Sequence, residues 1–254
     1  MRLKGKIAVV TGGSSGIGQA ICELFAEEGA KVVIADIDEA GAQVTREHIA
    51  AKNGEAMFVK TDISREAEVE SLMKSAVDAY GTVNVHVNNA AVFVMGKIED
   101  VSEADWHQAL NVNVLGPAFC TKHVVPIMKK AGGGVIVNIA SISSIIAQPG
   151  YVPYNTTKGA LLQLTRCCAL DLAPDNIRVN CICPGDVMTP AQEREVVEFN
   201  LDREEFFRKI AESNLMNRLA DSREIAYGAL FLACNESSFM TGSPLIMDAG
   251  YTTQ

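Results

Sequence analysis

The sequence predicts a doubly wound α/β fold, in which helices cover both faces of one parallel sheet of about seven strands. Short runs rich in valine and isoleucine alternate along the chain with longer segments whose apolar residues recur at helical spacing. The runs are apolar almost throughout, which is typical of parallel strands buried on both faces. Because crossovers between parallel strands are right-handed, the helices divide between the two faces.

The expected strands lie between helices that carry recognisable end signals. The strands span 6–11, 31–36, 56–62, 83–89, 134–141, 177–184 and 243–250. Gly29 is expected to end the first helix, while Ser64 and Gly81 are expected to begin and end another. The sequences SEADW and DSRE, which start at Ser102 and Asp221, match the capping box that begins a helix.

A chain of 254 residues, 48% of them apolar, is long enough for one large core, so we expect a single domain over residues 1–254. A long helix is expected from Pro153 to Ala173. The segment 186–217 follows the sixth strand and is irregular in pattern, mixing phenylalanine and methionine with charges. This segment is either a lid over a substrate or a pair of ordinary surface helices.

The composition disfavours several classes of protein. With 22 basic and 31 acidic residues the net charge is −9 and no basic run stands out, so nucleic acid is not an expected partner. No apolar run reaches the ~18 residues of a membrane span, so no membrane partner is expected. The seven cysteines form no C-x-x-C pair and no histidine cluster accompanies them, so no metal site is expected. Free thiols in this number suit a cytoplasmic protein.

A glycine-rich stretch, TGGSSGIG from Thr11 to Gly18, directly follows the first strand and opens the first helix. Gly12, Gly16 and Gly18 permit a tight turn and the close approach of a ligand to the backbone. The free N–H groups at the start of the helix then favour a pyrophosphate. The alternative is a glycine-rich turn that binds nothing, but the strand–turn–helix context predicts a dinucleotide site.

Asp36 ends the second strand, where a carboxylate can accept hydrogen bonds from both ribose hydroxyls of an adenosine. The same carboxylate would repel a 2′-phosphate. Ile37 and Asp38 follow it in place of Arg or Lys, and Ser15 in the glycine loop is neutral. These residues favour NAD over NADP as the cofactor.

Two further strand ends carry candidate contacts to a dinucleotide. Asp62 and Ile63, after the third strand, are placed to flank an adenine, although Asp62 fits equally well as a helix-start residue. The fourth strand ends in NNAA, from Asn88 to Ala91, and small residues there let the backbone lie close to a flat ligand. A simple turn is the alternative for NNAA.

Tyr154 and Lys158, in YNTTK, are four residues apart and therefore share one face of a helix. Together with TGGSSGIG, NNAA, NVNVLG, PGDVMT and a serine 13 residues before YNTTK, all in order, they make the whole chain resemble the short-chain dehydrogenase/reductase family in its single-domain form of about 250 residues. One departure is Ala91, where the family usually has glycine.

The resemblance implies a Rossmann-type fold, a homotetramer and a set of site residues. The implied catalytic residues are Asn113, Ser141, Tyr154 and Lys158. The implied cofactor contacts, besides the ribose and adenine candidates above, are Gly12, Ser15, Gly16, Ile17, Gly18, Asn89, Tyr154, Lys158, Pro184, Gly185, Val187 and Thr189. The implied role of Asn113 is to anchor a water that relays protons.

The chemistry of these residue types fits a proton and hydride transfer. A tyrosine with its ordinary pKa of about 10 is a poor base, but Lys158 and the positive nicotinamide ring are expected to stabilise its phenolate. Tyr154 can then remove the hydroxyl proton of an alcohol as the cofactor takes the hydride. Ser141 donates to the substrate oxygen and steadies its developing charge.

We therefore expect an NAD-dependent oxidoreductase that interconverts a secondary alcohol and a ketone, a small-molecule substrate bound by Ser141, Gln148 and Tyr154. Two alternatives remain open: an NADPH-dependent 3-oxoacyl thioester reductase, and a dinucleotide sensor without turnover. The substrate itself stays open, because a sugar, a steroid or a cyclic alcohol would suit the mostly apolar residues that flank the motifs. These residues are Phe93, Val94, Met95, Ile142, Gln148, Tyr151 and Met188.

Overall fold

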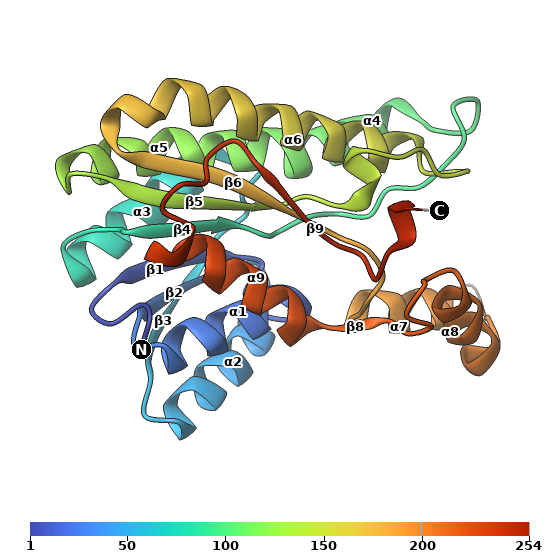
Figure 1. Ribbon diagram of the computed structural model, residues 1–254, viewed down its shortest axis with the longest axis horizontal. Coiled ribbons are helices and arrows are strands. Elements are labelled where there is room, and N and C mark those ends of the chain that lie inside the picture. Colours follow the sequence, from blue (N-terminus) through green and yellow to red (C-terminus); the bar gives the residue numbers. More distant parts are fainter. Residues whose placement is uncertain (199, 254) are drawn as a thin grey trace.

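A seven-stranded sheet, parallel throughout, forms the centre of the molecule in the computed structural model, which describes residues 1–198 and 200–253. Its strand order is β3-β2-β1-β4-β5-β6-β9 (Figure 1). The strands are β1 Ile7–Thr11, β2 Lys31–Asp36, β3 Glu55–Lys60, β4 Val85–Asn88, β5 Gly134–Ile139, β6 Ile177–Pro184 and β9 Pro244–Met247. The predicted sheet is therefore confirmed, with all its predicted strands.

Helices cover both faces of this sheet (Figure 1). On one face lie α1 Gly16–Glu27, α2 Glu39–Ala51 and α9 Ser222–Ala233, whose apolar residues share a core with β1, β2 and the N-terminal Leu3. On the other face lie α3 Glu66–Tyr80, α5 Gly116–Lys130 and α6 Val152–Leu172, with α4 Glu103–Leu110 beside α6. The central strands β1 and β4 are buried along their whole length, as expected for strands covered twice.

The segment 186–217 contains two helices and a short strand among its described residues. It contains β7 Val187–Met188, α7 Pro190–Glu198 and α8 Arg203–Glu212, and β7 pairs with β8 Ala220–Asp221 in a separate two-stranded sheet. Figure 1 shows α7 and α8 at the end of the molecule where β6 leads out of the main sheet. Of the two alternatives that the sequence left open, the pair of helices is present, and a role as a lid stays a prediction.

Most predicted helix ends are confirmed, and one is wrong. Gly29 and Gly81 have left-handed φ angles of 90° and 81° just beyond α1 and α3, and capping boxes begin α4 and α9 as predicted. Ser64 does not cap α3, which begins at Glu66. Its hydroxyl instead donates to Asp62 Oδ1 at 2.7 Å, because Asp62 forms a turn that uses the serine before the helix starts.

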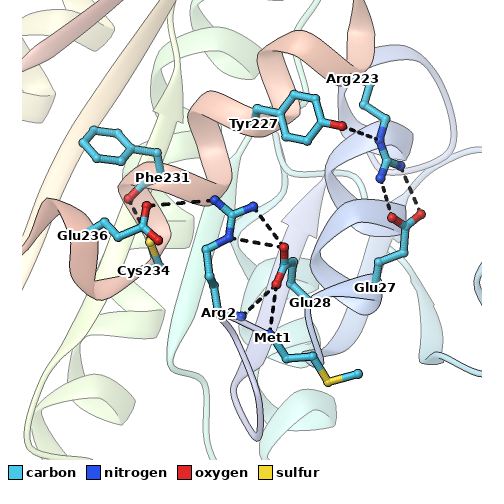
Figure 2. A network of polar contacts seen from close by, with 9 residues as sticks. All are labelled: Met1, Arg2, Glu27, Glu28, Arg223, Tyr227, Phe231, Cys234 and Glu236. Carbon is cyan, nitrogen blue, oxygen red and sulfur yellow. Dashed lines mark hydrogen bonds and ion pairs between the residues drawn. The ribbon is translucent and has the colours of Figure 1, made fainter.

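Two arginines tie the N-terminal segment and α9 to the end of α1 (Figure 2). Arg2 donates to Glu28 Oε1 from Nε at 3.2 Å and from Nη2 at 2.9 Å. Arg223 on α9 forms a bidentate pair with Glu27, with Nη1 3.1 Å from Oε1. The Arg223 hydrogen bond, opposed by partial burial and helped by Lys52, holds the pKa of Glu27 at about 2. These contacts reinforce the apolar packing of α1 on α9.

A chain of buried polar side chains runs from β4 to α6. His86 Nε2 lies 2.8 Å from Asn88 Oδ1, Asn88 Nδ2 donates to Asn138 Oδ1 at 2.8 Å, and Asn138 Nδ2 donates to Thr165 Oγ1 at 2.8 Å. His86 is fully buried, and its Nδ1 has no hydrogen-bond partner among the described residues. Burial lowers the pKa of His86 to about 4, so the ring is neutral and its Nε2–H donates to Asn88.

The buried His86 is expected to make the protein sensitive to mild acid. Its pKa is about 4 in the folded chain and 6.5 as the ordinary value, so its contribution to stability is present above pH 6.5 and is lost as the pH falls towards 4. Between pH 7 and pH 5 this loss amounts to about 2 kcal/mol. The free energy of unfolding is measured in urea at pH 7 and at pH 5. The decrease between these pH values should be smaller for His86→Gln than for the parent by about 2 kcal/mol. An equal loss in both proteins would contradict the prediction.

Candidate active site

The residues singled out from the sequence gather at the carboxyl ends of the parallel strands. Gly12 follows β1, Asp36 ends β2, Asn89 follows β4, Ser141 follows β5 and Gly185 follows β6. In a doubly wound sheet, ligands bind outside the carboxyl ends of the strands where the strand order reverses. Here the order reverses between β1 and β4, so these residues border one ligand site.

The glycine loop has the geometry of a phosphate cradle. Gly12 and Gly16 have left-handed φ angles of 67° and 55°, and a Cβ on Gly18 would lie 1.9 Å from the Gly12 carbonyl oxygen. Ser15 precedes α1, and its side chain makes no hydrogen bond to the helix. The first N–H groups of α1 are therefore left to donate to a ligand. The residues present therefore fit the pyrophosphate of a dinucleotide.

Two other segments support or border this loop. Asn89 Nδ2 donates to the carbonyl oxygens of Thr11 and Gly12, both at 3.0 Å, and these hydrogen bonds stabilise the turn. A Cβ on Gly16 would lie 3.6 Å from Thr189, which places the segment after β6 beside the loop. Ile17 packs against the core, and Val187 is buried with 6% of its surface exposed.

Asp36 is held by donors from two neighbouring segments. Its Oδ2 accepts from the Ser14 N–H at 3.0 Å and the Ser14 hydroxyl at 2.7 Å, and its Oδ1 accepts from the Asp38 N–H at 3.0 Å. Asp38 caps α2. Ile37 is 66% exposed beside it.

A lysine that the sequence does not place near Asp36 lies next to it in the sheet. Lys60 is the register partner of Asp36 on β3, 24 residues further along the chain. Its ammonium lies 2.9 Å from Glu39, so an acidic side chain already neutralises the one cation that strand pairing brings beside Asp36. Only the register of β2 and β3 reveals this neighbour.

The adenine candidates after β3 have partners in the protein itself. Asp62 Oδ1 accepts from the N–H of Ser64 at 3.0 Å and from its hydroxyl at 2.7 Å, so Asp62 forms a turn ahead of α3, which begins at Glu66. Ile63 is only 5% exposed and fills the space left by the missing side chain of Gly116. A contact of Asp62 and Ile63 with adenine stays a prediction.

The structure brings the four predicted catalytic residues together around α6. Tyr154 and Lys158 lie on this helix, with Lys158 Nζ 5.6 Å from the centre of the Tyr154 ring. Ser141, after β5, is hydrogen-bonded to the Tyr154 side chain. Lys158 is 3% exposed and donates to the Ile139 carbonyl oxygen at 2.9 Å.

Asn113 lies in a π-helical turn, Asn111–Leu115, and joins α6 to the segment after β4. Its Oδ1 accepts from the Val92 N–H at 2.8 Å, and its Nδ2 donates to the Val92 carbonyl oxygen at 2.9 Å and to Thr157 Oγ1 at 3.2 Å. Both polar atoms of the Asn113 side chain thus have partners in the protein. Thr157, which the sequence did not mark, is the partner through which it reaches α6.

The surroundings in the protein shift the pKa of both Tyr154 and Lys158. Burial, opposed by the Ser141 hydrogen bond, raises the pKa of Tyr154 to about 12. Burial also lowers the pKa of Lys158 to about 8. These surroundings keep the phenol protonated at neutral pH, and the stabilisation of its phenolate by Lys158 together with the nicotinamide ring stays a prediction.

Aromatic rings surround the phenol. The Phe93 ring lies edge-on to Tyr154 with centroids 4.4 Å apart, and Tyr151 lies edge-on to Phe93 at 5.4 Å. Phe93 is nevertheless 48% exposed. Gln148 Oε1 accepts from the Ser143 hydroxyl at 2.6 Å, two residues from Ser141. The phenol is therefore packed against an apolar ring, and a neutral amide lies near Ser141 in the same segment.

The other predicted pocket residues differ in exposure. Val94 and Ile142 are buried, whereas Met188 is 38% exposed at the start of the 186–217 segment. Over residues 1–198 and 200–253, no group of three or more His, Cys, Asp or Glu side chains is arranged to hold a metal ion. No helix in this part of the chain has the length and apolar character needed to cross a membrane.

Comparison with known proteins places this site in a family. A family profile described as "Enoyl-(Acyl carrier protein) reductase" matches residues 12–252. An uncharacterised oxidoreductase of Thermotoga maritima is 41% identical over 252 residues, which cover 99% of each chain. A cyclopentanol dehydrogenase of Comamonas sp. is 35% identical over 252 residues, which cover 99% of this chain and 98% of that protein.

A solved structure agrees with these relatives. The crystal structure of a protein from Burkholderia xenovorans, described as a short-chain dehydrogenase/reductase, matches with a TM-score of 0.97 and 36% identity over 100% of this chain and 98% of that one. The chain therefore belongs to the short-chain dehydrogenase/reductase family. It is an oxidoreductase that acts on CH–OH groups and uses a nicotinamide dinucleotide.

Proposed function

We propose that this protein is an NAD-dependent dehydrogenase that interconverts a secondary alcohol and a ketone. The observation that carries the proposal is the grouping of Ser141, Tyr154 and Lys158 beside a glycine loop with free N–H donors. The preference for NAD is supported by Asp36, whose carboxylate would face the adenosine ribose and repel a 2′-phosphate. Lys60, the nearest cation by strand register, is neutralised by Glu39.

The dinucleotide would be held by residues from every strand end at the site. A bound dinucleotide supplies the acceptor of the hydride and, when oxidised, a positive charge near the phenol. The residues proposed to hold it are Gly12, Ser15, Gly16, Ile17, Gly18, Asp36, Ile37, Asp62, Ile63, Asn89, Tyr154, Lys158, Pro184, Gly185, Val187 and Thr189.

Each catalytic side chain then has one task. Ser141 donates a hydrogen bond to the substrate oxygen, and Tyr154 exchanges the proton of that oxygen. With a pKa of about 12 in the ligand-free protein, the phenol is protonated at neutral pH and ready to act as the acid of ketone reduction. In alcohol oxidation it must first lose this proton, which the positive charges of Lys158 and the oxidised cofactor favour. Asn113 holds α6 and the segment after β4 together through its hydrogen bonds to Thr157 and Val92.

The residues around the phenol favour an uncharged cyclic alcohol as the substrate. Phe93 and Tyr151 provide ring faces, and none of the flanking residues Val94, Met95, Ile142 and Met188 carries a charge. Gln148, held by Ser143, offers one neutral polar contact. A relative named cyclopentanol dehydrogenase supports this class of substrate. The segment 186–217, which contains α7 and α8, is proposed to close over the substrate as a lid.

Two properties of the whole protein complete the proposal. A homotetramer is proposed from the family resemblance alone. A cytoplasmic location is proposed because all seven cysteines are free thiols.

Turnover with a panel of alcohols tests this proposal. Cyclic secondary alcohols, an open-chain secondary alcohol and a hydroxy acid are offered with NAD or NADP, and reduction of the cofactor is followed by absorbance. We expect reduction of NAD with the cyclic alcohols, and kcat/KM with NADP lower by about a hundredfold or more. The reverse assay offers a 3-oxoacyl thioester with NADPH. Faster turnover there than with any alcohol and NAD would contradict the proposal and favour a thioester reductase.

A further inference from the structure

The carboxylate of Asp36 is oriented by three hydrogen bonds from within the protein. One hydroxyl and two backbone N–H groups donate to it, at distances between 2.7 and 3.0 Å. The shortest of these contacts comes from the Ser14 hydroxyl, in the middle of the glycine loop, and it reaches Oδ2. Ser14 is 9% exposed, so the donor of this part-buried hydrogen bond is largely protected from water. It is the only one of the three donors to Asp36 that a side-chain substitution can remove.

The segments that carry these donors are packed against one another. Thr45 on α2 is fully buried, and its hydroxyl donates to the Gly13 carbonyl oxygen at 3.0 Å. A Cβ on Gly41 would lie 2.9 Å from the Ser14 carbonyl oxygen, so the start of α2 touches the glycine loop directly. These contacts join the start of α2 to the glycine loop, and the loop in turn carries the Ser14 donors to Asp36 at the end of β2.

Discrimination against a 2′-phosphate depends on where the negative charge of Asp36 sits. A carboxylate that turns away can make room for the phosphate, whereas one that is fixed opposes it at short range. We propose that Ser14 is a positioning residue for cofactor choice, whose hydroxyl fixes Asp36 toward the adenosine ribose and thereby sets part of the preference for NAD over NADP. This inference rests on the proposed function, in which Asp36 faces the ribose.

Equilibrium binding of NADH and NADPH, measured by nicotinamide fluorescence without any substrate, tests the inference. The ratio of the two dissociation constants is compared for the parent, Ser14→Ala, Ser14→Thr, Asp36→Ala and the double variant of Ser14→Ala with Asp36→Ala. Ser14→Ala is expected to lower the preference for NADH about fivefold to tenfold, because Asp36 keeps only its two backbone donors. Ser14→Thr, which keeps the hydroxyl, is expected to restore most of the preference.

The double variant separates positioning from a general effect on the loop. If Ser14 acts through Asp36, Ser14→Ala changes the ratio by less than about twofold once Asp36 is alanine. A Ser14 that merely shapes the loop would weaken NADH and NADPH equally and leave the ratio unchanged in both backgrounds, and this result would overturn the inference. Equal melting temperatures of parent and variants show that folding is intact.

The failure of the inference can be told apart from that of the proposed function. A parent that binds neither nucleotide, or binds both equally well, would refute the proposed role of Asp36 and the inference with it. A parent that prefers NADH beside a Ser14→Ala variant with the same preference would refute only the role of Ser14.

Discussion

Replacing Tyr154 with phenylalanine is expected to lower kcat for alcohol oxidation by about 10³- to 10⁴-fold, while the dissociation constant for NADH changes by less than about threefold. The substitution removes the one hydroxyl that exchanges a proton with the substrate oxygen in the proposed mechanism. The ring itself stays, and with it the edge-on contact to Phe93 at 4.4 Å. The loss therefore falls on the chemical step and spares the binding of the cofactor.

Steady-state kinetics and NADH binding measured on the same preparation check this result. Tyr227→Phe is the matched control, because it removes the same atom from a half-exposed tyrosine on α9 whose hydroxyl lies 3.5 Å from Arg223 Nε. It should keep the parent's kcat. A Tyr154→Phe enzyme that retained more than about a tenth of the parent's kcat would show that another group carries the proton.

Lys158→Met is expected to abolish turnover and, at the same time, to stabilise the ligand-free protein. The ammonium is 3% exposed, and burial lowers the pKa of Lys158 from 10.5 to about 8. This difference corresponds to about 3 kcal/mol by which the folded state disfavours the charged form. Losing the hydrogen bond to the Ile139 carbonyl oxygen lowers stability by about 1–2 kcal/mol and so offsets part of this gain. A net gain of about 1–2 kcal/mol in the free energy of unfolding at neutral pH is therefore expected.

Urea unfolding of the parent and Lys158→Met across a range of pH checks the stabilisation and its sign. Because the folded pKa lies below the unfolded one, the parent should gain stability as the pH rises from about 8 to 10.5, whereas the variant should not. Lys130→Met, at an exposed lysine on the last turn of α5, should change stability by less than about 0.5 kcal/mol. A less stable Lys158→Met protein at neutral pH would show that the buried ammonium is a net stabiliser.

The sheet could be predicted because its strands are apolar along their whole length and its helices end in recognisable caps. Two helices were harder to define. Helix α5 contains Pro126 in its interior, and a proline at such a position ordinarily ends a helix. Helix α2 buries only Ala42, Thr45 and Ile49, too few for a clear apolar stripe. Ser64 looked like a cap because a serine before acidic residues has the right pattern, and only the structure shows that Asp62 uses it.

The candidate site could be predicted where its residues occur in motifs and not where it depends on strand register or burial. Tyr154, Lys158 and the glycine loop are visible as spacings in the chain. Lys60 becomes a neighbour of Asp36 only through the pairing of β2 with β3. The pKa of Tyr154 depends on how much water surrounds the phenol, which spacing does not reveal, so its rise to about 12 could not be predicted from the sequence.

The packing of α1 against α9 has a consequence for how the chain is made. The core that surrounds α1 includes residues from Leu3 to Cys234, so α9 covers apolar surface on a helix that is synthesised about two hundred residues before it. Until α9 has been made, the nascent chain exposes that surface and is prone to aggregate. Contacts of such long sequence separation also make refolding slow, since a large loop must close before they form.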